Sequence, residues 1–177
     1  MALMTHPAKT HRMLRKITDY LLGLHARYRQ LFPSIDGILV LDDIIGFISG
    51  LQFEEFGLPY FRELFECPCS IRFLHNDAPC RESAAFLPEM NVNLFNMGVD
   101  TDLNQLKELT GNRVTLMGNI PPRDVMAGGT PDEVAAAVSR LKASLNDPSR
   151  IILSCGGGMP PGAPTENIQA FLEAARS

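Results

Sequence analysis

Several features are scarce or missing in this sequence, and each absence narrows the possible functions. Four cysteines among 177 residues are too few for a disulfide framework, which favours a reducing, cytoplasmic compartment. No apolar run approaches the roughly 20 residues that a membrane-spanning helix requires. The first residues lack the charged region and the apolar core of a secretory signal. We therefore expect a cytoplasmic protein with no membrane partner.

The balance of charge argues against nucleic acid as a partner. Sixteen Lys and Arg residues stand against 20 Asp and Glu residues, which gives a formal net charge of -4. Domains that bind nucleic acid are usually basic, and this sequence contains no run of Lys or Arg. We therefore predict no nucleic-acid partner.

Short apolar runs recur along the chain and are typical of buried strands. They are mostly aliphatic and are bounded by Gly, Asn, Asp or Arg. Continuous apolar strands without alternation favour a parallel sheet that is covered on both faces. The predicted strands are Ile38–Leu41, Ile71–Leu74, Val92–Phe95, Val114–Met117 and Ile151–Leu153.

Segments with helical periodicity lie before, between and after these runs. Asp102 predicts the start of a helix over 103–109, and Thr130 with Glu133 predicts a capping box at the start of another. A first helix ends before Pro33 and carries apolar residues at steps of three or four, namely Met13, Ile17, Leu21, Leu24 and Tyr28.

The alternation of strands and helices predicts the fold class. A first helix is followed by five strands, each followed by helical sequence, which indicates right-handed βαβ units around a parallel sheet. No repeat, low-complexity segment or linker interrupts the chain, so we expect residues 1–177 to form a single α/β domain. A doubly wound open sheet and part of a (β/α)8 barrel both fit five βα units, whereas a complete barrel needs at least about 200 residues.

The residues that directly follow the apolar runs are the candidate site residues. In parallel α/β folds, ligands bind beyond the carboxyl ends of the strands, an edge that we call the carboxyl rim. A helix cap or a turn is the alternative role for each residue there. The candidate catalytic residues at this rim are Asp42, Asp43, His75 and Asn119.

His75, Asp77 and Cys155 form a candidate zinc site at the same rim. Imidazole nitrogen, carboxylate oxygen and thiolate sulfur all bind zinc, and three protein ligands with one open position are typical of catalytic zinc. In the alternative interpretation, His75 is a neutral hydrogen-bonding residue and Asp77 caps a helix that begins near Arg81.

The remaining cysteines and histidines have simpler interpretations. Cys67-Pro68-Cys69 precedes the second predicted strand, at the end of the sheet opposite the carboxyl rim. A zinc cluster of Cys67 and Cys69 with Cys80 would need the chain to fold across the length of a strand, so we expect ordinary buried thiols. His6, His11 and His25 belong to the first helix or its approach, and we expect them at the surface.

Gly156, Gly157 and Gly158 follow the last predicted strand and are candidate cofactor-binding residues. Backbone amides in a glycine run can approach a phosphate or carboxylate group. The run lacks the Lys-Ser/Thr of a P-loop and the spacing of a dinucleotide motif. A tight turn that needs positive φ is the alternative.

A series of short motifs in fixed order extends over nearly the whole chain. The motifs are His6-Pro7, His11–Asp19, Asp42-Asp43, Phe53–Phe56, Leu58–Tyr60, Leu116–Pro121, Gly129–Pro131, Pro160-Pro161 and Pro164–Ile168. With these motifs the chain resembles the C-terminal half of the uroporphyrinogen decarboxylase superfamily, which also contains corrinoid-dependent methyltransferases.

This resemblance implies a (β/α)8 barrel of which the chain holds the last five strands. Decarboxylases of the family need no metal or cofactor. Their substrate-holding aspartate and carboxylate-binding arginines belong to the N-terminal half, which no position here matches. Their histidine near the last strand falls on Gly157. The resemblance therefore implies the barrel without the decarboxylase signature.

The methyltransferase branch binds zinc through a His-x-Cys pair and a Cys in the last strand–helix loop. His75 matches the histidine, whereas Asp77 and Gly157 stand where the two cysteines would be. Cys155 allows a shifted His75/Asp77/Cys155 site. Zinc in that branch lowers the pKa of a substrate thiol, which then attacks a methyl-corrinoid. The replacement of Cys by Asp departs from this chemistry.

Three functions remain after these comparisons of motifs. We favour a diverged corrinoid-linked methyltransferase-like enzyme, with zinc and a corrinoid methyl donor as cofactors. The first alternative is a uroporphyrinogen decarboxylase of porphyrin and haem biosynthesis, with a tetrapyrrole substrate and no cofactor. The second is a non-catalytic half-barrel. Five strands in an arc leave two unpaired edges and an uncovered inner face, so we also expect a homodimer.

Overall fold

One parallel sheet is the centre of the fold. The computed structural model describes residues 2–177, and the strands form one sheet in the order β1-β2-β3-β4-β5. Each predicted apolar run overlaps one of these strands, so the predicted α/β class is confirmed. The strands are β1 (Gly37–Leu41), β2 (Ile71–Asn76), β3 (Leu94–Met97), β4 (Thr115–Ile120) and β5 (Ile151–Cys155).

The strand order distinguishes between the two predicted architectures. Strands that are neighbours in the sheet are also neighbours in the chain. Every crossover connection therefore leads to the adjacent strand, always in the same direction across the sheet. Right-handed crossovers then place the connecting helices on one face of the sheet. A doubly wound sheet needs a reversal of strand order, and none occurs in residues 2–177. The fold is therefore a five-stranded arc of a (β/α) barrel.

Local capping explains where two of the helices begin. The Thr130 hydroxyl accepts a hydrogen bond from the Glu133 N–H at 3.3 Å, and the Glu133 carboxylate accepts one from the Thr130 N–H at 2.7 Å, which confirms the capping box of α7 (Pro131–Ser144). The Asp102 carboxylate accepts a hydrogen bond from the Asn104 N–H at the start of α6 (Leu103–Leu109).

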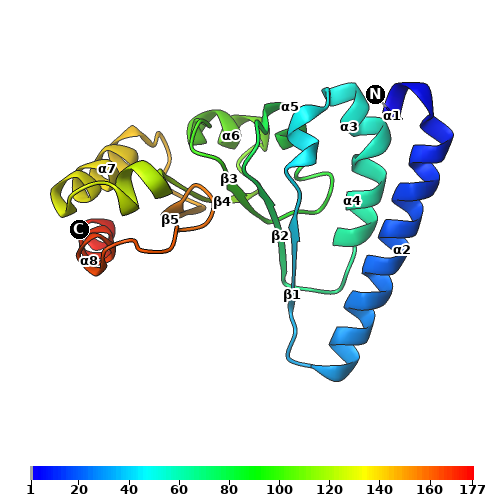
Figure 1. The fold of residues 1–177 in the computed structure, drawn as a ribbon, viewed down its shortest axis with the longest axis horizontal. Helices are drawn as coiled ribbons and strands as arrows, with labels where there is room; N and C mark the ends of the chain where they lie inside the picture. The colour runs from blue at the N-terminus through cyan, green and yellow to red at the C-terminus, as the bar shows by residue number, and fades with distance from the viewer. Residues whose placement is uncertain (1) are drawn as a thin grey trace.

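The other helices lie along the face of the sheet that the connecting helices cover, which we call the outer face, and at the two ends of the sheet. In Figure 1, α2, α3 and α4 lie beside β1 and β2, whereas α7 and α8 lie beside β5 at the other end of the arc. A 3-10 helix covers Ile44–Phe47 and a π-helix covers Pro122–Ala127. The remaining α-helices are α1 (Ala2–Thr5), α2 (Pro7–Leu31), α3 (Gly50–Phe56), α4 (Leu58–Phe65), α5 (Arg81–Ala84) and α8 (Thr165–Arg176).

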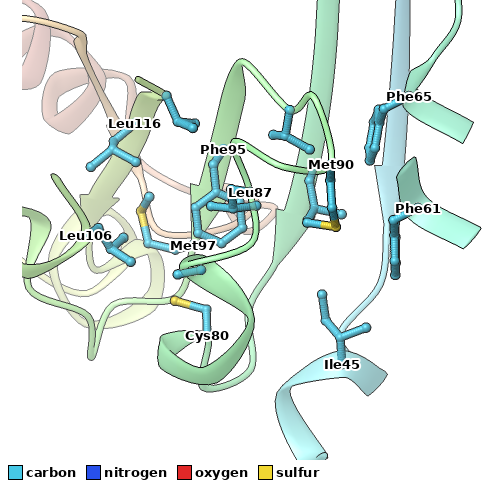
Figure 2. Packing of buried hydrophobic residues seen from close by; sticks show 14 of the residues in the cluster. Ile45, Phe61, Phe65, Cys80, Leu87, Met90, Phe95, Met97, Leu106 and Leu116 are labelled. Atoms are coloured by element: carbon cyan, nitrogen blue, oxygen red, sulfur yellow. The ribbon is translucent and has the colours of Figure 1, made fainter. Parts of the chain in front are cut away.

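Two apolar clusters join the helices to the sheet. In the larger one, side chains of β2, β3 and β4 pack against those of α3 to α6, and Figure 2 shows Phe95, Met97 and Leu116 among them. The smaller cluster lies between the ends of β4 and β5 and the helices α7 and α8, and contains Ile120, Met126, Val134, Ala137, Val138, Cys155 and Ala174.

The opposite face of the sheet, which we call the open face, is uncovered in this chain. Leu39 and Leu41 on β1 are 52% and 68% exposed, Ile71 on β2 is 50% exposed, and Ile152 on β5 is 45% exposed. The strand register places all four side chains on the same face. The uncovered inner face that a five-stranded arc predicts is therefore present, because single-handed crossovers supply helices to one face only.

The strands extend beyond the apolar runs that predicted them. β2 continues through His75 and Asn76, and β5 continues to Cys155. The extension has a physical cause, because backbone pairing continues through polar residues: His75 is in register with Leu41 on one side and with Asn96 on the other. His75 therefore lies within a strand and not in the loop that follows it.

The structure also bears on the membrane prediction. Within residues 2–177, every helix is too short or too polar to cross a lipid bilayer.

Candidate functional site

His75 lies on the open face near the carboxyl end of β2. Its partners in the register are Leu41 on β1 and Asn96 on β3, so the three side chains belong to the same face of the sheet. The imidazole is 15% exposed. It is therefore held by its neighbours and still reachable from the open face.

The buried side chain of Asn96 fixes the orientation of this imidazole. Its Oδ1 accepts a hydrogen bond from Nδ1 of His75 at 2.7 Å. Its Nδ2 group donates to the carbonyls of Met117 and Cys155. Because both amide protons are used there, the oxygen faces His75 and can only accept. In the neutral imidazole, Nδ1 therefore carries the proton and Nε2 keeps its lone pair.

Asp77 lies beside this free ring nitrogen. Its Oδ2 is 3.4 Å from Nε2 of His75, and its side chain is 46% exposed. Its backbone N–H donates to Oδ1 of Asp43 at 2.7 Å, which holds the start of the β2–α5 loop. Asp77 does not cap the next helix, because the N-cap of α5 is Cys80 and no side chain caps it. The predicted capping role is wrong.

The His75–Asp77 pair can transfer a proton. Nε2 can accept a proton from a bound molecule or donate one to it, and the neighbouring carboxylate stabilises the imidazolium that forms. Asn96 keeps the ring in the orientation that presents Nε2. The arrangement therefore supports general acid–base chemistry.

The glycine run lies against the same pair. A Cβ at Gly157 would stand 2.6 Å from Oδ2 of Asp77, and the φ of Gly157 is +85°. A Cβ at Gly156 would stand 2.8 Å from Cγ1 of Val99. These close approaches explain Gly156 and Gly157 as parts of a tight turn, whereas a Cβ at Gly158 would meet nothing within 4 Å. Because α8 begins only at Thr165 and a carboxylate adjoins the turn, the geometry gives no support to phosphate binding, and cofactor binding by Gly156, Gly157 and Gly158 stays a prediction.

Asp42 lies on the other face of β1, away from His75. It lines an apolar cavity of about 400 Å³ between α2 and β1, together with residues such as Ile17 and Tyr60. Burial raises the pKa of the Asp42 carboxyl, although hydrogen bonds from the backbone of Ile44 and Ile45 partly oppose the rise. Of the two predicted aspartates, only Asp43 reaches the His75–Asp77 pair.

Asn119 is also separated from His75. Its Nδ2 donates to the carbonyl of Thr101 at 2.7 Å and lies 3.4 Å from the carbonyls of Gly98 and Val99. The side chain thus ties the β3–α6 loop to the end of β4. These contacts give Asn119 a structural role and do not place it in the site predicted from the sequence.

The predicted His75/Asp77/Cys155 zinc site is not assembled. The Cys155 side chain is buried in the smaller apolar cluster, and this burial raises the pKa of its thiol. Among residues 2–177, these three side chains do not bring their ligand atoms within reach of one ion. The end of β5 directs Cys155 toward the helices, away from His75 and Asp77. Of the three predicted ligands, the structure brings together only His75 and Asp77, and zinc binding at the rim stays a prediction.

The remaining thiols and histidines divide between expected and unexpected positions. Cys80 is buried and contacts Thr101, far from Cys67 and Cys69, as predicted. His11 is not a free surface residue, because Nδ1 is 2.8 Å from the Tyr60 hydroxyl and the ring stacks on Phe56.

Sequence reasoning missed Asn96, although a signal for it exists. Asn96 directly follows the third apolar run, which is the same position that identifies His75 after the second run. The Asn96 side chain is buried, and a buried polar side chain needs a hydrogen-bond partner. In this fold the partner is the candidate catalytic histidine.

Comparisons with known proteins place the chain in a family. A sequence model of the uroporphyrinogen decarboxylase (URO-D) family matches residues 1–177, and the chain therefore belongs to this family. It is 25% identical to a uroporphyrinogen decarboxylase of Pelodictyon phaeoclathratiforme and 26% identical to one of Coxiella burnetii. These matches cover 94% and 99% of this chain but 48% and 49% of the relatives. The chain thus spans about half the length of the curated relatives it matches.

A solved structure supports the fold. A methyltransferase from Methanosarcina mazei matches with a TM-score of 0.69 at 20% identity, over 81% of this chain and 42% of that chain. This likeness agrees with an arc taken from a larger barrel.

The hydrogen bond between Asn96 and His75 predicts the tautomer of the imidazole. In wild-type protein at alkaline pH, we expect ¹⁵N–¹H NMR spectra to show His75 protonated on Nδ1. In Asn96→Leu the partner of Nδ1 is lost, and we expect the ring signals to shift toward a mixture of tautomers, whereas exposed His6 keeps its spectrum. A His75 that is protonated on Nε2 in the wild type would contradict the assignment.

Proposed function

We propose that the chain supplies the catalytic carboxyl rim of a metal-free decarboxylase that acts on a tetrapyrrole with acetate side chains. The observation that carries this proposal is the His75 imidazole, which is fixed through Nδ1 by Asn96 and faces Oδ2 of Asp77 with Nε2 at 3.4 Å. The reaction class is supported by the URO-D family and by the names of its curated relatives.

Such a reaction needs the chemistry that the pair offers. When an acetate group loses carbon dioxide, the C–C bond breaks and one proton takes the place of the carboxyl group on carbon. An imidazolium at Nε2 of His75 can donate that proton, and solvent can then protonate the ring again. Asp77 lies beside the charged ring before it donates the proton, and the ring is neutral until solvent protonates it again. His75 would thus take the role of the family histidine whose position Gly157 occupies.

The corrinoid-linked alternative receives less support from the geometry. Its thiol activation depends on zinc held by thiolates, and the Cys155 thiol lies in the smaller apolar cluster, turned away from His75. The methyltransferase from Methanosarcina mazei supports the shared fold and not a shared reaction. Methyl transfer from a corrinoid to a thiol is therefore the alternative reaction that the functional test also measures.

Turnover of uroporphyrinogen tests the proposed reaction. We expect purified chain to convert uroporphyrinogen to products with fewer carboxyl groups, detected by chromatography. Because a general acid contributes about 100-fold or more to rate, His75→Ala should lower turnover by at least that factor, and Asp77→Asn should lower it less.

The matched control for this test is Cys155→Ser. The decarboxylase proposal predicts that this variant keeps its turnover, because the thiol does not reach His75. Absence of turnover in the wild type, or turnover that survives His75→Ala, would refute the proposal. Methyl transfer from methylcobalamin that is lost in both His75→Ala and Cys155→Ser would favour the corrinoid-linked enzyme instead.

We also propose that two chains associate through the open face. Leu39, Leu41 and Ile71 expose apolar surface there, and β1 has a free edge next to them. The substrate of the proposed reaction carries carboxylates, whereas Asp43 and Asp77 flank the site. We therefore expect the second copy of the chain, which covers this face, to supply the cationic groups that bind the substrate.

The mass of the chain in solution tests the association. Light scattering after size exclusion should give twice 19.5 kDa for the wild type. A charge on the open face should prevent pairing, so Leu41→Glu is expected to give the monomer mass. Leu172→Glu on the outer helix α8 is the control and should remain dimeric. A wild type that is monomeric at all concentrations would contradict the proposal.

A further inference from the structure

A second group of metal-ligating side chains lies at the end of the sheet opposite the carboxyl rim. His25 extends from α2, and Cys67 and Cys69 come from the loop between α4 and β2. One ligand atom from each of the three residues lies within 4.8 Å of the other two. Within residues 2–177, no other group of three or more His, Cys, Asp and Glu side chains is as close.

The loop that carries the two cysteines is held in a defined turn. The N–H of Cys69 donates to the carbonyl of Cys67 at 2.8 Å, and Pro68 between them restricts the backbone. The Arg72 guanidinium donates to the carbonyl of Cys69 from β2. The turn thus presents both thiols toward α2 before any ion is bound.

The distances suit a tetrahedral zinc ion. Zn–S bonds of about 2.3 Å and Zn–N bonds of about 2.0 Å place tetrahedral ligand atoms about 3.5 to 3.8 Å apart. Sγ of Cys69 is 3.7 Å from Nε2 of His25. With an upper limit of 4.8 Å for the other separations, the site needs to contract by no more than about 1 Å, which side-chain rotation can supply.

The surroundings give such an ion a structural purpose. Beside His25, a cavity of about 260 Å³ separates the second half of α2 from β1, and Leu21, Leu24 and Tyr28 line it. Apolar side chains therefore do not fill the space between this half of α2 and β1. An ion bound by both α2 and the α4–β2 loop would hold the helix to the sheet beside this cavity.

We propose that His25, Cys67 and Cys69 bind one zinc ion, with water as the fourth ligand, and that the ion fastens α2 to the start of β2. The thiolate-rich donor set favours zinc over magnesium or calcium. Three protein ligands and a water are the set typical of catalytic zinc, but the position opposite the carboxyl rim assigns this ion to stability. The proposal does not depend on the proposed decarboxylation.

Metal content and stability test the site on the untagged chain, purified without chelator under reducing conditions. Native mass spectrometry should find one zinc ion per chain, and chelator should lower the melting temperature. His25→Ala and Cys69→Ala should weaken zinc binding by more than about 100-fold, since loss of an outer-shell partner alone costs about 10- to 100-fold. Both variants should also lose the response of the melting temperature to zinc.

Matched controls separate this site from the carboxyl rim. His75→Ala and Cys80→Ala remove the same two residue types elsewhere and should keep the zinc ion. Zinc that is lost in His75→Ala and kept in His25→Ala would overturn the proposal and restore a rim site.

A measurement on the wild type remains decisive if the variants fail to fold. Zinc should protect Cys67 and Cys69 from alkylation, as mapped by mass spectrometry of peptides, and cobalt in its place should give a thiolate charge-transfer absorption band. Equal alkylation with and without zinc would overturn the proposal, as would a Cys67–Cys69 disulfide that persists under reducing conditions.

Discussion

One buried amide holds the carboxyl rim together. Asn96 is 4% exposed and lies on β3, where it accepts a hydrogen bond from His75 on β2 and donates to the carbonyls of Met117 on β4 and Cys155 on β5. Buried polar groups need partners, so loss of this amide would leave a ring N–H and two carbonyls unpaired. The pairing of four strands and the orientation of the candidate catalytic ring therefore depend on the same side chain.

The strand order determines from which side this ring can be reached. The register places His75 on the open face, which also exposes Leu39 and Leu41 and which no helix of residues 2–177 covers. In the proposed association, a partner that covers the apolar surface also encloses the His75–Asp77 pair. The cluster of His25, Cys67 and Cys69 lies at the other end of the sheet, apart from the pair.

Local patterns predicted much of the fold, because apolar runs and capping residues act over a few positions. The five strands and the starts of α6 and α7 depend on such patterns. Side-chain direction at the rim could not be predicted in the same way. Asn119 and Cys155 follow or end apolar runs as His75 does, yet they turn to a loop and to the helices. The contact between His25 and Cys69 joins residues 44 positions apart, and no local pattern encodes it.

The free energy of unfolding of Asn96→Ala tests the central claim most directly. Three hydrogen bonds of a buried side chain contribute about 1 kcal/mol each, so we predict a loss of about 3 kcal/mol in urea unfolding. The exposed Asn146→Ala serves as the control and should change stability by less than about 0.5 kcal/mol. A loss in Asn96→Ala as small as that of the control would contradict the claim that this amide organises the rim.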